Sequence, residues 1–253
     1  MKTYEFYFSP TGGTKKVADS LTGMLADEVV QVDLTDSNCD FSVNVLAQED
    51  IAVIAVPSYG GRVPAVAVER LASVQGNGAC AILVCVYGNR AYEDTLVELQ
   101  DTAKQAGFRV CGDVAAVAEH SIARQFAAGR PDEQDIHQLE TYAKQIREKL
   151  AAGDFTESAI PGNRPYKKTG GVGMTPKATR ACTQCGVCAR VCPVQAIHTD
   201  NPKEVEEKAC ISCMRCVSVC PHSARKVNAA MLAAVGLALK KVCSTRKECE
   251  LYL

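Results

Sequence analysis

Two cysteine-rich segments near the carboxyl end constrain the fold of this 253-residue chain more than any other feature. The segments CTQCGVCARVCPVQA (182–196) and CISCMRCVSVCPHSA (210–224) superimpose with a period of 28 residues, and each has the spacing C-x2-C-x2-C-x3-C-P. The first three sulfurs of a segment can curve inward around one metal centre, whereas a fourth from the same tight loop would strain it. The fourth cysteine of each segment is therefore expected to bind the centre of the other segment.

This spacing predicts two [4Fe-4S] clusters with crossed ligands. Zinc bound at two four-cysteine sites is the competing interpretation, but zinc sites use paired C-x2-C knuckles separated by a longer span. The region also resembles a bacterial two-cluster ferredoxin, and that resemblance implies clusters close enough for direct electron transfer at low potential. The predicted ligands are Cys182, Cys185, Cys188 and Cys220 for one cluster, and Cys210, Cys213, Cys216 and Cys192 for the other.

The other cysteines are interpreted from the expected compartment. No apolar stretch reaches the roughly 18 residues that span a bilayer, and no signal peptide is recognised, so we expect a cytoplasmic protein without a membrane span. Because the cytosol keeps thiols reduced, the 14 cysteines are not expected to form a disulfide framework. Cys80, Cys85 and Cys111 fall in apolar strands and are expected in the core, whereas Cys39, Cys243 and Cys249 receive no role.

Strand-like and helix-like segments alternate through the first 150 residues. The strand-like segments are nearly continuous apolar runs, such as IAVIAV at 51–56, as expected for parallel strands covered on both faces. This alternation predicts an α/β fold with a doubly wound, five-stranded parallel sheet. Strands are expected at 3–8, 28–34, 51–56, 80–86 and 109–118, and helices at 14–26, 64–74, 91–106 and 132–151; none is assigned to 35–50.

Composition divides the chain into four parts. Residues 1–158 are expected to form the α/β domain, and residues 177–228 a small α+β domain around the clusters. The stretch between them, 159–176, is rich in Gly, Pro and small polar residues and is predicted to be a linker. Its GGVGM only superficially resembles a dinucleotide loop, because no strand precedes it. Residues 229–253 are predicted to be a helix that packs back on a domain, followed by a tail.

The net charge of −1 hides an asymmetry. Residues 1–159 carry 13 Lys and Arg against 23 Asp and Glu, whereas residues 160–253 carry 15 against 6. A basic part can indicate a nucleic-acid surface, but its two aromatic residues, Tyr166 and Tyr252, are too few for stacking platforms. We expect no nucleic-acid partner; the basic residues offset the negative charge that thiolate-bound metal centres bring.

The segment SPTGGT, residues 9–14, ends the first predicted strand and begins the first helix. It lacks the lysine of a P-loop, so hydroxyl groups, backbone amides and the helix N-terminus are expected to hold a phosphate. The segment resembles the [ST]-x-T-G-x-T loop of flavodoxins, and that resemblance implies FMN as the ligand. The residues assigned to the phosphate are Ser9, Pro10, Thr11, Gly12, Gly13 and Thr14.

Two further loops match the ring-binding loops of the flavodoxin family. They follow the strands at 51–56 and 80–86, and each carries an aromatic residue that can stack on one face of the flavin ring. Because the chain has no Trp, Tyr59 with Tyr87 or Tyr92 must take the place that tryptophan has in many flavodoxins. By this resemblance, a peptide at Gly60 or Gly61 could flip to hydrogen-bond the N5 atom of the reduced flavin. The residues assigned to the ring are Pro57, Ser58, Tyr59, Gly60, Gly61, Tyr87, Gly88, Asn89 and Tyr92.

Glu119, His120 and Ser121 follow the fifth predicted strand and could border the same cleft. His120 is expected to be a structural hydrogen-bonding residue rather than a proton donor. No catalytic residues are assigned, because the chain offers no dinucleotide fingerprint and no convincing acid–base pair.

Residues 3–228 as a whole resemble a flavodoxin–ferredoxin fusion of the kind common in anaerobes. The resemblance implies an electron-transfer flavoprotein in which FMN and two [4Fe-4S] clusters exchange electrons with redox partner proteins. Two alternatives stay open: a flavin-dependent reductase of a small acceptor, such as a quinone or nitro compound, fed through the clusters, and an iron–sulfur redox sensor without flavin.

Overall fold

A six-stranded sheet forms the centre of the computed structural model, which describes residues 1–168 and 173–253. Five of its strands run parallel in the order β2-β1-β3-β4-β5. This is the strand order of the flavodoxin-like doubly wound fold, so the predicted fold class is confirmed. The strands are β1 (Thr3–Tyr7), β2 (Val29–Asp33), β3 (Ile51–Pro57), β4 (Cys80–Tyr87) and β5 (Arg109–Val117).

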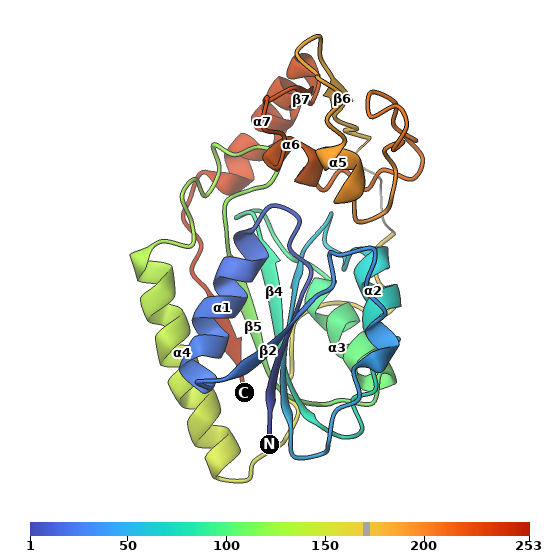
Figure 1. Cartoon of the computed structure of the whole chain (residues 1–253). Helices are drawn as coiled ribbons and strands as arrows, with labels where there is room; N and C mark the ends of the chain where they lie inside the picture. Colours follow the sequence, from blue (N-terminus) through green and yellow to red (C-terminus); the bar gives the residue numbers. More distant parts are fainter. Residues whose placement is uncertain (169–172) are drawn as a thin grey trace.

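The sixth strand, β8 (Glu250–Tyr252), is not predicted by the sequence. It pairs antiparallel with β5, with Tyr252 opposite Asp113 and Glu250 opposite Ala115. The end of the chain therefore returns from the cysteine-rich region to the edge of the sheet, where the sequence predicts only a tail (Figure 1). A strand of three residues carries too short an alternation to be recognised from its pattern.

Two helices cover each face of the sheet (Figure 1). On one face Leu21 and Leu139 are fully buried against strands β3 and β4, and on the other face Leu71 and Leu96 are buried in the same way. The helices are α1 (Gly13–Leu25) and α4 (Glu133–Ala151) on the first face, and α2 (Ala65–Leu71) and α3 (Thr95–Gln105) on the second. The unassigned stretch before β3 contains only a short 3-10 helix, η1 (Phe41–Val43).

Part of the predicted linker is tied to α3. The Asp94 carboxylate, just before this helix, accepts hydrogen bonds from the backbone amides of Asn163 at 2.8 Å and Lys167 at 2.7 Å. Arg164 pairs with Asp101 on the same helix at 2.7 Å. The residues from 163 to 167 therefore lie along the sheet-bearing part, and residues 169–172, which include most of GGVGM, lie outside the described residues.

The cysteine repeat folds as two similar units at the carboxyl ends of the parallel strands (Figure 1). Each unit has a short helix, and the first and last strands of the region, β6 (Lys177–Ala178) and β7 (Arg225–Lys226), pair antiparallel. Left-handed residues recur at positions 28 apart, so the sequence repeat is also a repeat in backbone conformation. These pairs are Gln184 and Ser212, Gly186 and Met214, and Gln195 and Ser223; the helices are α5 (Val187–Arg190) and α6 (Arg215–Ser218).

The helix predicted near the carboxyl end is α7 (Ala229–Cys243). Its side chains Val235, Leu239 and Cys243 pack against Ala123 and Phe126, which lie in the loop after β5. No helix within residues 1–168 and 173–253 has both the length and the apolar character that crossing a bilayer requires.

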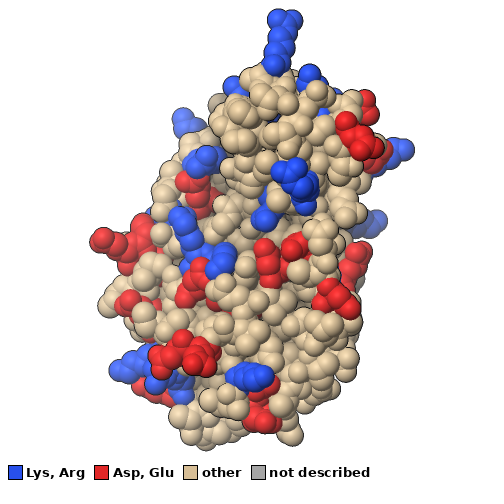
Figure 2. Space-filling view, in the orientation of Figure 1, with Lys and Arg blue, Asp and Glu red and all other residues tan. Residues whose placement is uncertain are grey.

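The charge asymmetry of the sequence does not give separate acidic and basic halves on the face shown in Figure 2. Acidic and basic side chains are interspersed over the lower part, and the upper part is largely uncharged with charged side chains mainly along its rim. The upper part contains the cysteine segments, which consist largely of small and apolar residues.

Candidate functional site

The loop between β1 and α1 has the construction of an anion site. Ser9 is buried, and its hydroxyl accepts a hydrogen bond from the backbone amide of Lys15 at 2.9 Å. Gly12 precedes the helix with a φ of 91°, a left-handed conformation that glycine adopts without strain. The first helical hydrogen bond runs from the Lys16 amide to the Gly12 carbonyl, so the amides of Gly13 and Thr14 have no partner within the helix. An anion at this helix N-terminus would receive both amides and the favourable helix dipole.

A cavity of about 460 Å³ lies beside this loop, at the carboxyl ends of β1, β3, β4 and β5. Ligands of open α/β sheets bind in this position. A Cβ atom added to Gly88 would lie 2.7 Å from the ring of His120, so glycine is needed where these two loops meet. Nine residues assigned to FMN line the cavity: Pro10, Thr11, Gly13, Thr14, Pro57, Ser58, Tyr59, Tyr87 and Gly88.

Two of the residues assigned to the flavin ring point away from this cavity. The side-chain amide of Asn89 donates to the carbonyls of Cys243 at 2.8 Å and Thr245 at 2.9 Å, and thereby holds the returning carboxyl-terminal segment. The Tyr92 hydroxyl bonds Tyr252 at 2.8 Å, and its ring is buried in the core. Neither residue lines the cavity, because both side chains reach toward β8 and the segment before it.

The other assigned residues support the loops without lining the cavity. Gly60 and Gly61 have φ values of 62° and 85° and form the centre of a tight turn, in which Tyr59 and Arg62 exchange two backbone hydrogen bonds. Two successive left-handed residues are what a type I′ turn requires, which explains the glycine pair. The side chain of Arg62 fixes the turn through a two-pronged ion pair with Glu98, at 2.6 and 2.7 Å. Ser9 and Gly12 likewise shape the loop at 9–14 without lining the cavity.

The loop after β5 supplies four wall residues that are not among the assigned contacts: Ala118, Glu119, His120 and Ser121. His120 Nδ1 accepts hydrogen bonds from the backbone amides of Ile122 and Ala123, both at 3.2 Å. Burial lowers the pKa of His120, so the ring is neutral with its proton on Nε2. This hydrogen-bonding role is the one expected from the sequence. The only feature of the sequence that indicates these residues as part of the cavity wall is their position directly after the fifth strand.

The eight repeat cysteines surround two separate cavities. One has a volume of about 320 Å³ and the other about 360 Å³, and each is lined by three cysteines of one segment and the fourth of the other. Three cysteines of one segment thus meet the fourth of the other, as the spacing predicts. The first cavity is lined by Cys182, Cys185, Cys188 and Cys220, and the second by Cys192, Cys210, Cys213 and Cys216.

The backbone around the crossed cysteines points amides at their sulfurs. The Ala196 amide donates to Cys192 Sγ at 3.3 Å, and the Ala224 amide, 28 residues later, donates to Cys220 Sγ at 3.2 Å. Burial raises the pKa of the Cys213 thiol to about 12. Because metal binds the thiolate, loading this site must release protons. Such amide–sulfur bonds help to set the reduction potential of a bound cluster.

The second cysteine cavity lies against the loops of the sheet. Arg70 on α2 donates to the Leu34 carbonyl at 2.6 Å and to the Pro193 carbonyl at 2.5 Å, so it connects β2 to the residue after Cys192. Tyr59 of the 460 Å³ cavity and Ile211 of the second cysteine cavity pack against the same hydrophobic core. Arg215, in the wall of the second cysteine cavity, approaches the Ser9 carbonyl of the loop at 9–14 at 3.5 Å. The two sites are therefore neighbours.

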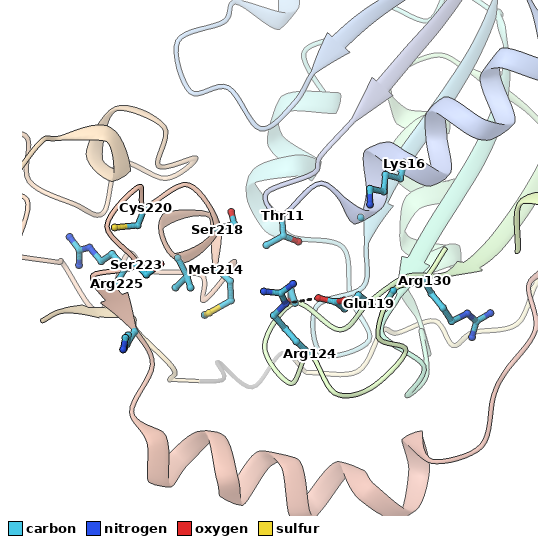
Figure 3. A pocket seen from close by; sticks show the side chains of 15 residues that line it. Thr11, Lys16, Glu119, Arg124, Arg130, Met214, Ser218, Cys220, Ser223 and Arg225 are labelled. Atoms are coloured by element: carbon cyan, nitrogen blue, oxygen red, sulfur yellow. Dashed lines mark hydrogen bonds and ion pairs between the residues drawn. The ribbon is translucent and has the colours of Figure 1, made fainter. Parts of the chain in front are cut away.

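A larger crevice, with about 1380 Å³ of empty space including its open mouth, separates the loop at 9–14 from the second half of the repeat (Figure 3). It adjoins the 460 Å³ cavity, with which it shares Thr11 and Glu119 among its walls. Glu119 pairs with Arg124 at 2.5 Å inside it, and hydrogen bonds from the Gly129 amide and Arg124 lower the pKa of this carboxyl. The crevice is also lined by four further basic residues: Lys16, Arg130, Arg225 and Lys226.

Comparisons with known proteins found one matching family and several similar structures. Residues 181–224 match the 4Fe-4S dicluster domain family. The sheet-bearing part is similar to a flavodoxin from Streptococcus pneumoniae TIGR4, with 22% identity, a TM-score of 0.44, and 59% of this chain and 99% of that chain covered. It is also similar to rubredoxin oxygen:oxidoreductase from the anaerobe Desulfovibrio gigas, with 20% identity, a TM-score of 0.44, and 60% and 36% covered. No curated protein matches the sequence.

Proposed function

We propose that this chain, which joins a flavodoxin-like fold to a 4Fe-4S dicluster domain, is an iron–sulfur flavoprotein that transfers electrons between FMN and two [4Fe-4S] clusters. The observation that carries the proposal is the proximity of two predicted cofactor sites. Arg215, in the wall of the second cysteine cavity, approaches the Ser9 carbonyl of the loop at 9–14 at 3.5 Å. Tyr59 of the flavin cavity and Ile211 of the second cysteine cavity pack against the same hydrophobic core. Electrons move between redox centres that are held close together.

The phosphate of FMN would be held by the loop at 9–14. The free amides of Gly13 and Thr14 and the hydroxyl of Thr11 would bind its oxygens, while Ser9 keeps the loop in shape. Tyr59 and Tyr87 would flank the ring, because they are the aromatic residues in the walls of the cavity. When bound, FMN supplies the capacity to accept one or two electrons.

The proposed ligand sets are the two groups of cysteines that line the two cavities. The set of Cys192, Cys210, Cys213 and Cys216 would hold the cluster nearer the flavin. Two residues in the wall of its cavity are joined to the sheet: Pro193 through Arg70 to the Leu34 carbonyl, and Arg215 to the Ser9 carbonyl. The other set would hold the outer cluster. We propose the same domain limits as from the sequence, 1–158 and 177–228, with β8 added to the first domain.

Partner proteins of the electron-transfer kind would exchange electrons with the outer cluster in the cytoplasm. A second candidate is favoured by the crevice of about 1380 Å³ that adjoins the flavin cavity. This crevice has room for a small acceptor, which would make the protein a flavin-dependent reductase fed through its clusters.

Cofactor analysis of anaerobically purified protein tests the proposal. We expect about eight irons per chain, a flavin spectrum over broad iron–sulfur absorbance, and FMN released by acid. Cys188→Ser and Cys213→Ser should each lose about half of the iron and keep the FMN, and Cys39→Ser, at an exposed cysteine outside the repeat, should lose neither. Colourless protein that retains zinc would overturn the proposal. About eight irons per chain without flavin would also contradict it and would favour the iron–sulfur redox sensor without flavin. Saturable reoxidation by a quinone or nitro compound would favour the reductase.

A further inference from the structure

Among the cavity-lining positions at which the two halves of the repeat differ, two exchange an aliphatic residue for an arginine. Position 187 is Val in the first half, and its counterpart 28 residues later is Arg215; position 197 is Ile, and its counterpart is Arg225. Val187 and Arg225 line the first cavity, whereas Arg215 and Ile197 line the second. At these two positions each cavity has one aliphatic residue and one arginine, but the arginine occupies a different symmetry position in each.

Arg225 is enclosed beside the first cavity. It is 2% exposed, and its guanidinium donates to the carbonyl of Pro176 at 3.2 Å and to the carbonyl of Pro202. Its Nε atom is buried and has no hydrogen-bond partner among the residues that the structure describes. A buried donor without a partner is costly, so a sulfur atom of a cluster in this cavity is the partner that the position lacks.

Arg215 has the corresponding place beside the second cavity, at the boundary with the sheet. Its Nη1 approaches the Ser9 carbonyl at 3.5 Å, and its Nε is also buried without a partner in the described part of the chain. The side chain is half-buried, whereas Arg225 is enclosed. Solvent therefore screens the charge of Arg215 more than that of Arg225.

We infer that Arg225 and Arg215 each raise the reduction potential of one cluster, Arg225 that of the Cys182, Cys185, Cys188 and Cys220 cluster and Arg215 that of the other. This inference rests on the proposed function, because it requires both clusters. Reduction adds one electron and hence one negative charge to a cluster, and a nearby cation with a free N–H stabilises the reduced state. The better-enclosed arginine has the larger effect, so the outer cluster is reduced first.

The repeat itself supplies the substitutions for the test. Arg225→Ile and Arg215→Val introduce the residues that the chain already has at the equivalent positions of the other half. The control is Arg190→Ser, which exchanges an exposed arginine for its counterpart, Ser218. Should Arg225→Ile bind less iron, Arg225→Gln, which can still donate to one of the two carbonyls, gives the same comparison.

The measurement is a redox titration of the anaerobic holoprotein followed by electron paramagnetic resonance, after iron and flavin have been counted. Arg225→Ile should lower the reduced-to-oxidised ratio of the first-reduced cluster about tenfold at a fixed potential, which is about 59 mV for a one-electron couple. Arg215→Val should lower the ratio of the other cluster only, by about threefold. Arg190→Ser should change neither.

The inference would be overturned if Arg225→Ile kept its full iron and flavin and the reduction potentials of both clusters were unchanged. It would also be overturned if either arginine variant shifted both potentials equally. Both results would leave the proposed function intact. If the anaerobically purified wild-type protein contained no clusters, by contrast, the proposed function itself would be contradicted.

Discussion

Asp113 provides a test of how burial acts on the sheet of this protein. It lies in β5 opposite Tyr252 of β8 and is 0% exposed. Its Oδ2 accepts a hydrogen bond from the Ser158 hydroxyl at 3.0 Å, while its Oδ1 has no partner among the described residues. Burial raises the pKa of Asp113 from its ordinary 3.8 to about 7. We predict that Asp113→Asn stabilises the protein at alkaline pH.

The sign follows from the raised pKa. The folded protein holds the Asp113 proton more tightly than the unfolded chain does. The free energy of unfolding therefore decreases as the pH rises from about 4 to about 7; the loss is complete above about pH 7 and disappears as the pH falls toward 4. At about 1.36 kcal/mol per pH unit, the difference between 3.8 and about 7 amounts to about 4 kcal/mol at pH 8 and about 2 kcal/mol at pH 5. Asn removes this cost and can keep the bond to Ser158.

Thermal unfolding followed by circular dichroism at pH 8 and pH 5 measures the effect. For a chain of this length about 1 kcal/mol corresponds to roughly 2–4 °C, so Asp113→Asn should raise Tm by about 8–16 °C at pH 8 and about half as much at pH 5. Asp27→Asn, at an exposed aspartate in the loop before β2, is the control and should change Tm little at either pH. An equal gain at both pH values for Asp113→Asn would refute the assignment of the effect to ionisation.

Three further predictions concern the proposed cofactor sites. Tyr59→Ala should weaken FMN binding to the flavin-free protein by about 3- to 10-fold in a fluorescence titration, whereas Tyr92→Phe, at a tyrosine turned toward β8, should leave it unchanged; equal losses would contradict the placement of the ring. Gly88→Ala should also weaken FMN binding, because its Cβ would lie 2.7 Å from the His120 ring. Unchanged affinity would mean that His120 can move aside without disturbing the cavity. Arg70→Met removes two hydrogen bonds that connect the sheet to the second cysteine site, so electron transfer between flavin and clusters should slow in stopped-flow reduction with both cofactors retained; an unchanged rate would exclude a positioning role for this arginine.

The two cysteine cavities illustrate what could be predicted from the residues alone. The spacing within each segment limits which three sulfurs can meet, and the fourth has to cross over, so the grouping of Cys220 with Cys182 follows from local geometry. The same holds for the parallel sheet, because apolar runs alternate with amphipathic helices at lengths that admit few topologies. The loop at 9–14 also follows from neighbours in sequence, since a strand, two glycines and a helix start are consecutive there.

Contacts between distant segments could be decided only by the tertiary structure. The three residues of β8 carry too little pattern to predict their pairing with β5, yet that pairing turns Tyr92 away from the cavity and the segment before it holds Asn89. The sequence likewise predicts that the two cysteine sites share a repeat, but not which of them faces the loops of the sheet, because pseudo-symmetric halves look alike until one of them docks. That choice depends on the contacts of Arg70 with Pro193 and of Arg215 with Ser9, between residues more than a hundred positions apart, whose free energy no local pattern encodes.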